Sequence, residues 1–304
     1  MISALRKQGF NQSQIATNLQ RHRSTICREF KRNCGRPGHY RPAEAVFMTS
    51  GRRSRSRRNQ QFCNQQLARV ESLLFEHWSP EQISGFLRKE REFLISHETI
   101  YRHVWKDLKR GGTLHSYLRC ARKKRRKRYA AYDSRGRLAG KRHISERPAR
   151  VENRAQLGHW EIDTVMGTGS KHCIVSLVER KSGYVLIGKL RARTQQQTTA
   201  RTLRLIRQHP ERFKTITADN GTEFHDYESI ERATQVPFYF ATPYHSWERG
   251  TNENTNGLIR QYIPKGVCMK KLDQYQCNAI ARKLNRRPRK RLGYRTPEEC
   301  FYAN

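Results

Sequence analysis

The sequence predicts an α/β protein in which helical segments precede a mixed β-sheet covered by helices. In the first third of the chain, apolar residues recur at the three-to-four-residue spacing of amphipathic helices. From residue 159 onward they gather in short runs rich in β-branched and aromatic residues. A third observation, the strongly basic charge, indicates what the helical part binds.

The charge of the chain indicates a nucleic-acid partner. There are 62 Lys and Arg against 26 Asp and Glu, a formal net charge of +36. Residues 1–150 carry +25 of this charge and residues 151–304 carry +11. A polyanion relieves such self-repulsion, and phosphates release counterions when Lys and Arg replace them. An anionic membrane surface is the rival partner, but no amphipathic basic helix with an aromatic face stands out.

The length of 304 residues exceeds a single hydrophobic core, so we expect more than one domain. The sequence has no run of about 18 apolar residues, which predicts no membrane span. Its beginning, MISALRKQGFNQS, lacks the apolar region of a secretory signal, so we expect a cytoplasmic protein. The eight cysteines are scattered without a CxxC pair, which favours reduced thiols over a zinc ribbon.

Residues 1–35 predict a first helix-turn-helix. A short helix from Gln12 to Leu19 is followed by a turn and by a second helix over 25–32, with Ser24 as the N-cap. The positions expected to face DNA are Arg23, Thr25, Arg28, Lys31 and Arg32. An ordinary helical hairpin with a solvated basic face is the alternative. The short turn together with the basic second helix favours insertion into the major groove.

Residues 66–118 predict a second helix-turn-helix region. The segment WSPEQISGFL begins with Ser79 as the N-cap and Gln82 three residues later, the pattern of a capping box. A turn leads to a second helix, SHETIYRHVW, at 96–105. The positions expected to contact DNA there are His97, Thr99 and Arg102. A structural hairpin remains the alternative.

Two basic segments, 36–65 and 119–150, are predicted to be linkers. The first contains GRRSRSRRNQQ and the second contains RCARKKRRKR. Such runs follow phosphates without reading bases, although a solvated linker is equally consistent with their composition.

Residues 151–304 predict a ribonuclease-H-like catalytic domain. Its order is three strands, helix, strand, helix, strand, helix, which is typical of that mixed sheet. The expected strands are 159–167, 172–180, 184–190, 214–219 and 238–241, and the expected helices include 194–208 and 246–262.

Two carboxylates in this domain are expected to meet. Asp163 lies inside the first strand, where side-chain alternation places it on one face with Glu161 and Val165. A carboxylate in the middle of a strand costs free energy unless a cation compensates it. Asp219 ends the fourth strand. The first and fourth strands are neighbours in a ribonuclease-H-like sheet, so the sequence predicts that the two side chains converge.

Glu253 is the third carboxylate of the predicted site. It lies on the expected helix 246–262, and Arg260 follows seven positions later on the same helical face. A metal-binding Glu and a phosphate-binding Arg are thus expected side by side, which favours Glu253 over its rivals. The rivals are Glu161, Glu223, Asp226 and Glu248.

Three carboxylates suit a pair of divalent ions about 3.5–4 Å apart. One ion would activate water or a 3′-hydroxyl, and the other would stabilise the leaving 3′-oxygen. Oxygen ligands favour Mg²⁺, with Mn²⁺ as a substitute, over zinc.

Several sequence blocks carry a resemblance to a known family. They are HWEIDTV, VERKSGY, DNGTEF, PYHSWERGTNENTNGLIRQYIPKG and LNRRPRKRLGYRTPEECF, together with STICREFKRN and WSPEQISGFL…SHETIY. With these blocks the chain resembles, almost from end to end, the transposases of insertion-sequence family 30. The NENTNGLIRQY block is the most specific of them.

The resemblance implies a bacterial transposase with an Asp-Asp-Glu catalytic triad, which matches Asp163, Asp219 and Glu253 here, and with Arg260 at the family's basic position. Such enzymes bind terminal inverted repeats, hydrolyse a 3′ end and use its hydroxyl to attack target DNA. The resemblance further implies double-stranded DNA partners, a homo-oligomer and a nucleoid-associated location. Family members carry an additional N-terminal helix, whereas this sequence starts almost at the first helix-turn-helix, as a truncated or misassigned start would explain.

Two other functions are consistent with parts of the pattern. A DNA-binding repressor or decayed transposase would keep the helix-turn-helix segments without catalysis. A nuclease of the same fold would cut without joining, but the long basic first half and Arg260 argue against it.

Overall fold

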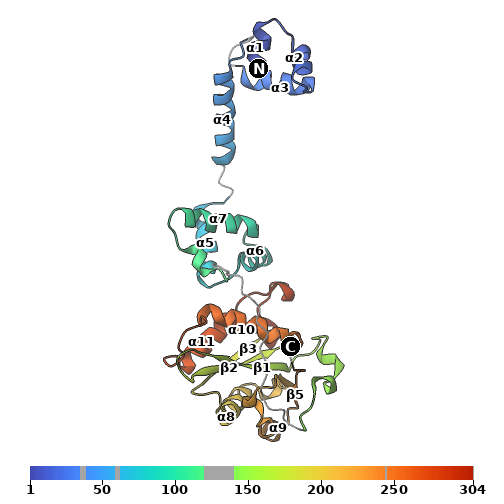
Figure 1. Cartoon of the computed structure of the whole chain (residues 1–304), viewed down its shortest axis with the longest axis vertical. Helices are drawn as coiled ribbons and strands as arrows, with labels where there is room; N and C mark the ends of the chain where they lie inside the picture. Colours follow the sequence, from blue (N-terminus) through green and yellow to red (C-terminus); the bar gives the residue numbers. More distant parts are fainter. Residues whose placement is uncertain (35–38, 59–61, 120–139, 244, 304) are drawn as a thin grey trace. The chain divides into compact units, whose positions relative to one another are not determined.

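The computed structural model describes residues 1–304 apart from 35–38, 59–61, 120–139, 244 and 304 (Figure 1). The described residues form two compact units, 1–68 and 69–304. Within this described part, no helix is long and apolar enough to cross a membrane.

The first unit is helical. Its helices are α1 (Ile2–Lys7), α2 (Gln12–Asn18), α3 (Arg23–Asn33) and α4 (Pro42–Arg58), while α5 (Asn64–Phe75) runs into the second unit. Ile15 and Ala16 of α2 pack against Ile26 and Phe30 of α3, which confirms the predicted pair of helices.

The cap of α3 differs from the prediction. His22, and not Ser24, is its N-cap residue. The Nδ1 atom of His22 accepts the backbone N–H of Ser24 at 3.2 Å and lies 2.8 Å from the Ser24 hydroxyl. An imidazole nitrogen thus satisfies the helix terminus in place of the expected hydroxyl, and the helix starts earlier.

The predicted linker 36–65 is wrong in its middle, which forms the 17-residue helix α4. This helix packs against α3: the Arg52 guanidinium donates to the Arg32 carbonyl oxygen at 2.8 Å and to the side chain of Asn33. Thr49 also donates to Asn33, at 3.3 Å. Arginine and alanine are good helix formers, so a basic run needs only such tertiary contacts to become a helix.

The second unit contains the predicted second helix pair, α6 (Pro80–Lys89) and α7 (His97–Lys109). The Ser79–Gln82 capping box is present, which confirms that prediction. Buried side chains on both helices hold the pair together, namely Ile83, Leu87, Ile100 and Val104. Helix α5, which the sequence does not predict, lies beside them: Glu71 of α5 is 2.7 Å from His103 of α7, and Val70 and Leu74 are buried.

A five-stranded sheet forms the centre of the rest of this unit, as predicted. The strands are β1 (His159–Met166), β2 (Cys173–Glu179), β3 (Val185–Leu190), β4 (Thr215–Ala218) and β5 (Phe238–Phe240). Their spatial order is β3-β2-β1-β4-β5. The first three strands are antiparallel, whereas β4 pairs in parallel with both β1 and β5. This confirms the mixed sheet and the adjacency of the first and fourth strands.

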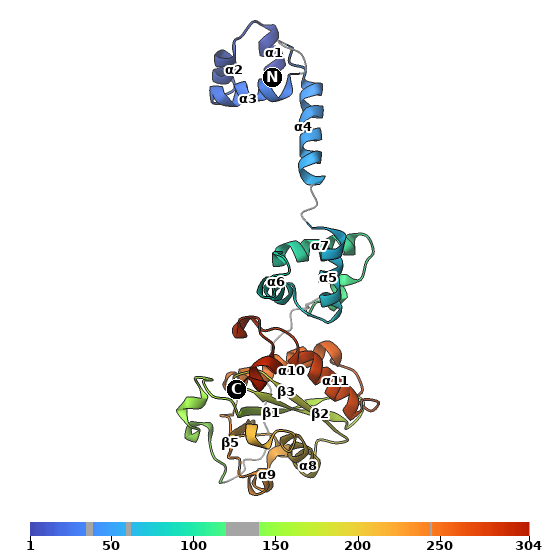
Figure 2. The same ribbon diagram turned by 180° about the vertical axis from the view of Figure 1, so that it is seen from behind.

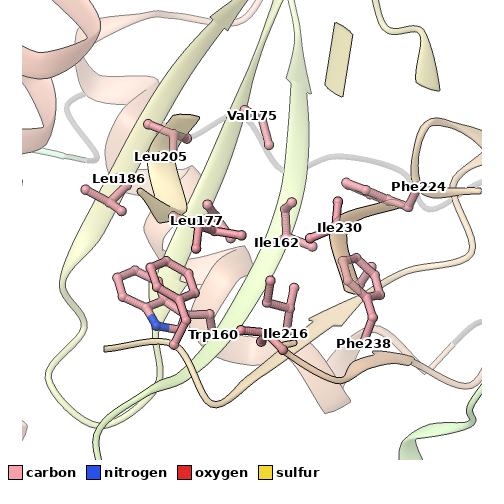
Figure 3. Packing of buried hydrophobic residues seen from close by; sticks show 14 of the residues in the cluster. Trp160, Ile162, Val175, Leu177, Leu186, Leu205, Ile216, Phe224, Ile230 and Phe238 are labelled. Atoms are coloured by element: carbon pink, nitrogen blue, oxygen red, sulfur yellow. The ribbon is translucent and has the colours of Figure 1, made fainter. Parts of the chain in front are cut away.

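Helices cover both faces of the sheet (Figures 1 and 2). One face carries α8 (Gln195–Ile206) and α9 (Tyr227–Thr234), and the other carries α10 (Gly250–Tyr262) and α11 (Gln274–Asn285). The short helix α12 (Pro297–Tyr302) follows. Side chains of β1 point alternately to the two faces of the sheet, so the strand contributes to a hydrophobic core on each face. Ile162 packs with Leu205 and Ile230 on the first face (Figure 3), whereas Val165 packs with Ile259 on the second.

The predicted linker 119–150 is also wrong at its end; residues 120–139 lie outside the described part. The segment after them forms the short 3₁₀ helices Ile144–Glu146 and Ala149–Val151 and packs against the sheet. The Phe240 N–H donates to the Arg142 carbonyl oxygen at 2.9 Å, and His143 forms an isolated parallel bridge with Phe240. These residues cover the edge of β5.

Candidate active site

The register of the two central strands brings Asp163 and Asp219 together. Glu161 of β1 pairs with Thr217 of β4, so the residues two positions further along lie at the same level. Both carboxylates contact one guanidinium, that of Arg249. Its Nη2 lies 3.2 Å from Asp219 Oδ2 and its Nη1 lies 4.0 Å from Asp163 Oδ1. The predicted convergence of these two side chains is confirmed.

Asp163 is firmly oriented. Its Oδ1 accepts the Thr164 backbone N–H, and its Oδ2 accepts the Asn256 side-chain N–H, both at 2.8 Å. Burial raises the pKa of Asp163 to about 6; Arg249 opposes this rise, and Asp219 adds to it. A bound cation would favour the ionised form of such a carboxylate.

Asp219 lies in a tight loop directly after β4. The Gly221 N–H donates to its Oδ1 at 2.9 Å. A Cβ at position 221 would lie 2.9 Å from that same oxygen and 2.5 Å from Glu223 Oε2. Glycine is therefore needed here, because any side chain would displace one of two carboxylates.

Arg249 was not predicted as a site residue. It ends the 3₁₀ turn Ser246–Arg249 immediately before α10, and 13% of its side chain is exposed. It also donates to the Ile162 carbonyl oxygen at 3.0 Å, which fixes the guanidinium between β1 and β4. The sequence could have indicated Arg249 as a site residue, because it precedes Glu253 by four positions, about one helical turn.

Hydrogen bonds between polar side chains attach α10 to the sheet beside Asp163. The Ser176 hydroxyl lies 3.2 Å from Asn252 Oδ1 and 2.9 Å from Asn256 Oδ1. The Asn252 backbone N–H donates to Glu161 Oε2 at 2.8 Å, which satisfies an N–H in the first turn of α10. Ser176 was not predicted either, because only the pairing of β1 with β2 places it opposite Asp163.

Glu253 is exposed on α10, one turn before Asn256, which holds Asp163. Within the described residues, Glu253 has no hydrogen bond or ion pair, and no three His, Cys, Asp or Glu side chains gather closely enough to hold a metal ion. The structure thus brings two of the three predicted carboxylates together and places the third on the adjacent helix.

The rival carboxylates have other partners. Glu161 binds the start of α10, and Asp226 accepts the Ser229 hydroxyl at 2.6 Å. Glu248 accepts the Thr242 backbone N–H at 2.8 Å and the Thr242 hydroxyl at 2.9 Å. Burial alone would raise the pKa of Glu248, but these hydrogen bonds outweigh burial and lower the pKa.

Glu223 differs from these rivals because it lies next to the aspartates. It is 3% exposed and accepts the Thr164 hydroxyl at 2.6 Å. Its Oε2 lies 3.7 Å from the Arg193 Nε.

Arg260 is half-buried and donates to the Met166 carbonyl oxygen at 2.9 Å, so it joins α10 to the end of β1. Burial lowers its pKa from the usual arginine value. Its predicted phosphate contact stays a prediction.

The predicted DNA-facing residues of the two helix pairs are mostly exposed. On α3 these are Arg23, Thr25, Arg28, Lys31 and Arg32. On α7, His97 is exposed, Thr99 is half-buried and lies 2.9 Å from the Ser96 hydroxyl, and Arg102 forms an ion pair with Glu98 at 2.6 Å. An exposed basic face on α3 is what groove binding requires, whereas Arg102 is partly neutralised.

Two protein families match the chain. Residues 1–33 match a helix-turn-helix domain, and residues 153–246 match the integrase core domain. The first match covers α1 to α3, and the second covers the five strands with both aspartates. A DNA-binding part followed by an integrase-type fold is therefore established.

Curated relatives extend over nearly the whole chain. The transposase for insertion sequence element IS4351 of Bacteroides fragilis is 42% identical over 301 residues, 99% of this chain and 92% of its own length. The transposase InsI for insertion sequence element IS30A of Escherichia coli (strain K12) is 38% identical, over 94% of this chain and 77% of its own length. The transposase for insertion sequence element IS1086 of Cupriavidus metallidurans is 36% identical, over 93% and 86%.

Two solved structures overlap 48% of this chain. A chain from the simian T-cell lymphotropic virus intasome in complex with the PP2A regulatory subunit B56 gamma has a TM-score of 0.41 and 16% identity, with 55% of its own length covered. The catalytic core domain of BIV integrase has a TM-score of 0.38 and 21% identity, with 94% covered.

Proposed function

The chain belongs to the transposases of insertion-sequence family 30, and from this premise we propose that Asp163, Asp219 and Glu253 hold the divalent metal ions of its DNA cleavage and joining reaction. The observation that carries the proposal is the shared cation contact: Arg249 contacts both aspartates with one guanidinium. Two carboxylates that already share a positive partner make a suitable site for a doubly charged ion.

The donor set fits a hard cation. Carboxylate oxygens are the ligands that Mg²⁺ and Mn²⁺ prefer, and all three proposed ligands are carboxylates. When bound, such ions supply an activated water or 3′-hydroxyl and neutralise charge on the leaving 3′-oxygen.

The chain's own residues prepare this site. Thr164 and Asn256 fix both oxygens of Asp163, and Gly221 fixes one oxygen of Asp219. Because Asn256 and Glu253 share α10, the helix that positions the first ligand also carries the third. Arg260, on the same face as Glu253, is proposed to contact a DNA phosphate.

The proposed substrates are the element's terminal inverted repeats and the target DNA. The exposed basic residues of α3 and α7 would hold the repeats, and the integrase core would cut a 3′ end and join it to target. Two element ends must meet for this reaction, so we propose a homo-oligomer. A repressor or catalytically decayed remnant is not favoured, because the similarity to transposases spans nearly the whole chain.

The test is cleavage and joining of labelled inverted-repeat DNA in Mg²⁺ by the full chain, its Asp219→Asn variant and its Glu253→Gln variant. We expect both variants to lose at least about 100-fold in rate, as is typical when a group that stabilises developing charge is removed. Asp226→Asn is the matched control, because this carboxylate lies in the same loop and binds only Ser229 among the described residues. Equal product from wild type and Asp219→Asn would overturn the proposal.

A further inference from the structure

A strongly basic pocket lies apart from the two aspartates, within residues 69–304. Its volume is about 260 Å³, and its lining comes from the start of α6, from α10, from the segment after α11, and from His77 and Arg119. Four of its lining residues are arginines, Arg119, Arg287, Arg289 and Arg291, and we call this the arginine pocket. Nothing in the proposed catalytic reaction uses it.

Arg287 is buried without a counter-charge. Its side chain is 1% exposed, and it donates to Gln261 Oε1 and to the Tyr262 hydroxyl, both at 2.7 Å. Its Nε has no hydrogen-bond partner within the described residues, and no carboxylate there lies within ion-pair distance of it. Neutral partners satisfy part of the guanidinium but leave its charge uncompensated.

The other arginines of the pocket also bind neutral oxygens. Arg289 donates to the Leu284 carbonyl at 3.2 Å, Arg291 to the Lys181 carbonyl at 2.5 Å, and Arg119 to Asn254 Oδ1 at 3.1 Å.

The acidic lining residue of the pocket does not offset this charge. Glu81 is engaged by Lys290 at 2.6 Å. Burial, and then the positive charges of Arg287, Arg291 and Arg119, lower the pKa of Arg289 to about 9. The pocket therefore concentrates positive charge that the protein itself does not neutralise.

An anion is what this arrangement lacks. Like charges in a partly buried site repel each other, and a guanidinium fork matches the oxygens of a phosphate. The pocket also borders the catalytic helix, because Asn254, which Arg119 binds, is the residue after Glu253. A phosphate held there would belong to DNA that passes along α10.

We propose that the arginine pocket binds a phosphodiester group of the DNA backbone close to the reacting strand. This rests on the proposed handling of DNA by the integrase core, but not on the identity of the metal ligands. The role is to position DNA, since backbone contacts set register without reading sequence.

The test measures DNA affinity without catalysis. The full chain is titrated into a short fluorescein-labelled duplex in EDTA, and anisotropy gives the dissociation constant over a series of KCl concentrations. We expect Arg289→Gln and Arg119→Gln each to weaken binding on every duplex sequence and to reduce the slope of log affinity against log salt by about 1. Arg287 is left in place because its burial makes misfolding the expected result of substitution.

Arg286→Gln is the matched control. This neighbouring arginine has a 70% exposed side chain paired with Glu298 at 3.0 Å, so its loss should leave both affinity and slope near wild type. Pocket variants with the wild-type slope would overturn the proposal. The titration is made in EDTA and measures binding alone, so failure of the pocket is separated from failure of the catalytic assignment, which the cleavage assay tests.

Inorganic phosphate supplies the second arm. If phosphate raises the melting temperature of wild type but not of Arg289→Gln, and the DNA slope also falls, the pocket binds phosphate as part of DNA. If phosphate stabilises wild type while the DNA slope is unchanged, the pocket binds a free anion and the proposal is wrong.

Discussion

At the scale of single residues, Arg249 lets Asp163, which lies within β1, sit beside Asp219, which directly follows β4. Without a positive partner, Asp163 and Asp219 would repel each other, and the partly buried Asp163 would carry an uncompensated charge. The strand pattern predicted both aspartates, because alternation and strand order are local or fold-level properties. It did not predict Arg249, Ser176 or Asn256 as their partners, since those contacts arise only when α10 packs on the sheet.

Replacing Arg249 should make the site depend more on metal. We expect Arg249→Gln to lose about 1–2 kcal/mol of stability in EDTA, because the aspartates lose their shared cation. Mn²⁺ should then raise the melting temperature of the variant more than that of wild type. Arg249→Lys keeps the charge and should behave more like wild type. Equal Mn²⁺-induced shifts in all three proteins would show that the guanidinium and the metal do not share a site.

The buried His159 predicts a pH dependence of stability. It is 2% exposed, lies 2.9 Å from the Thr215 hydroxyl, and has a pKa lowered to about 4 by burial and then by Lys214 and Arg150. Between about pH 6.5 and 4 the unfolded chain binds the proton and the folded chain does not, so stability falls as pH falls through this window.

The size of this effect is on the order of 3 kcal/mol at most. It is measured as the difference in urea unfolding free energy between wild type and His159→Gln at pH 7 and pH 4.5. Wild type should lose more stability than the variant over that interval. If the unfolding free energy of the two proteins fell equally between pH 7 and pH 4.5, groups other than His159 would cause the loss of stability in acid.

At the scale of elements, the sequence predicts those helices and strands that local patterns determine, but not those that depend on tertiary contacts. The capping box at Ser79 and the five strands follow from local pattern, and all of them are present. Helix α4 was hidden by its basic composition, because its register on α3 depends on Arg52 reaching Asn33 across 19 positions. The predicted helix 246–262 starts at Gly250 instead, after a 3₁₀ turn that aims Arg249 at the aspartates.

Attachment of α10 to the sheet should depend on Glu161. This 1% exposed carboxylate accepts the Asn252 N–H and lies 3.5 Å from the 5% exposed side chain of Arg180. We expect Glu161→Gln to cost about 1–3 kcal/mol in urea unfolding, because the buried Arg180 guanidinium would keep only Glu152, at 3.1 Å, as its charged partner among the residues that the structure describes.

Glu298→Gln provides the comparison at the surface. Its pair with the exposed Arg286 should contribute less than about 1 kcal/mol. If the two substitutions had equal effects, the pairing of Glu161 would add nothing to the stability of α10.

At the scale of the whole molecule, charge is the dominant feature. The excess of 36 positive charges opposes a compact fold, and the larger share lies in residues 1–150. Composition alone predicted this and the nucleic-acid partner. It did not show that residues 69–304 form one compact unit, in which the second helix pair belongs with the integrase core.

A polyanion should therefore stabilise the full chain. We expect heparin to raise the melting temperature by several degrees at low salt, since about 1 kcal/mol corresponds to roughly 2–4 °C for a domain of this size. Added KCl should reduce the effect by screening. Polylysine serves as the control and should give no increase. If heparin left the melting temperature unchanged, repulsion among the positive charges of the chain would not limit its stability.

The backbone contacts of Arg142 and His143 with Phe240 also matter for self-association. An uncovered strand edge offers free N–H and C=O groups to any other chain, and short covering segments remove that hazard. A fragment cut to the matched integrase core, residues 153–246, would lose this cover and would also lose α10. Such a fragment should aggregate where the longer chain remains dispersed.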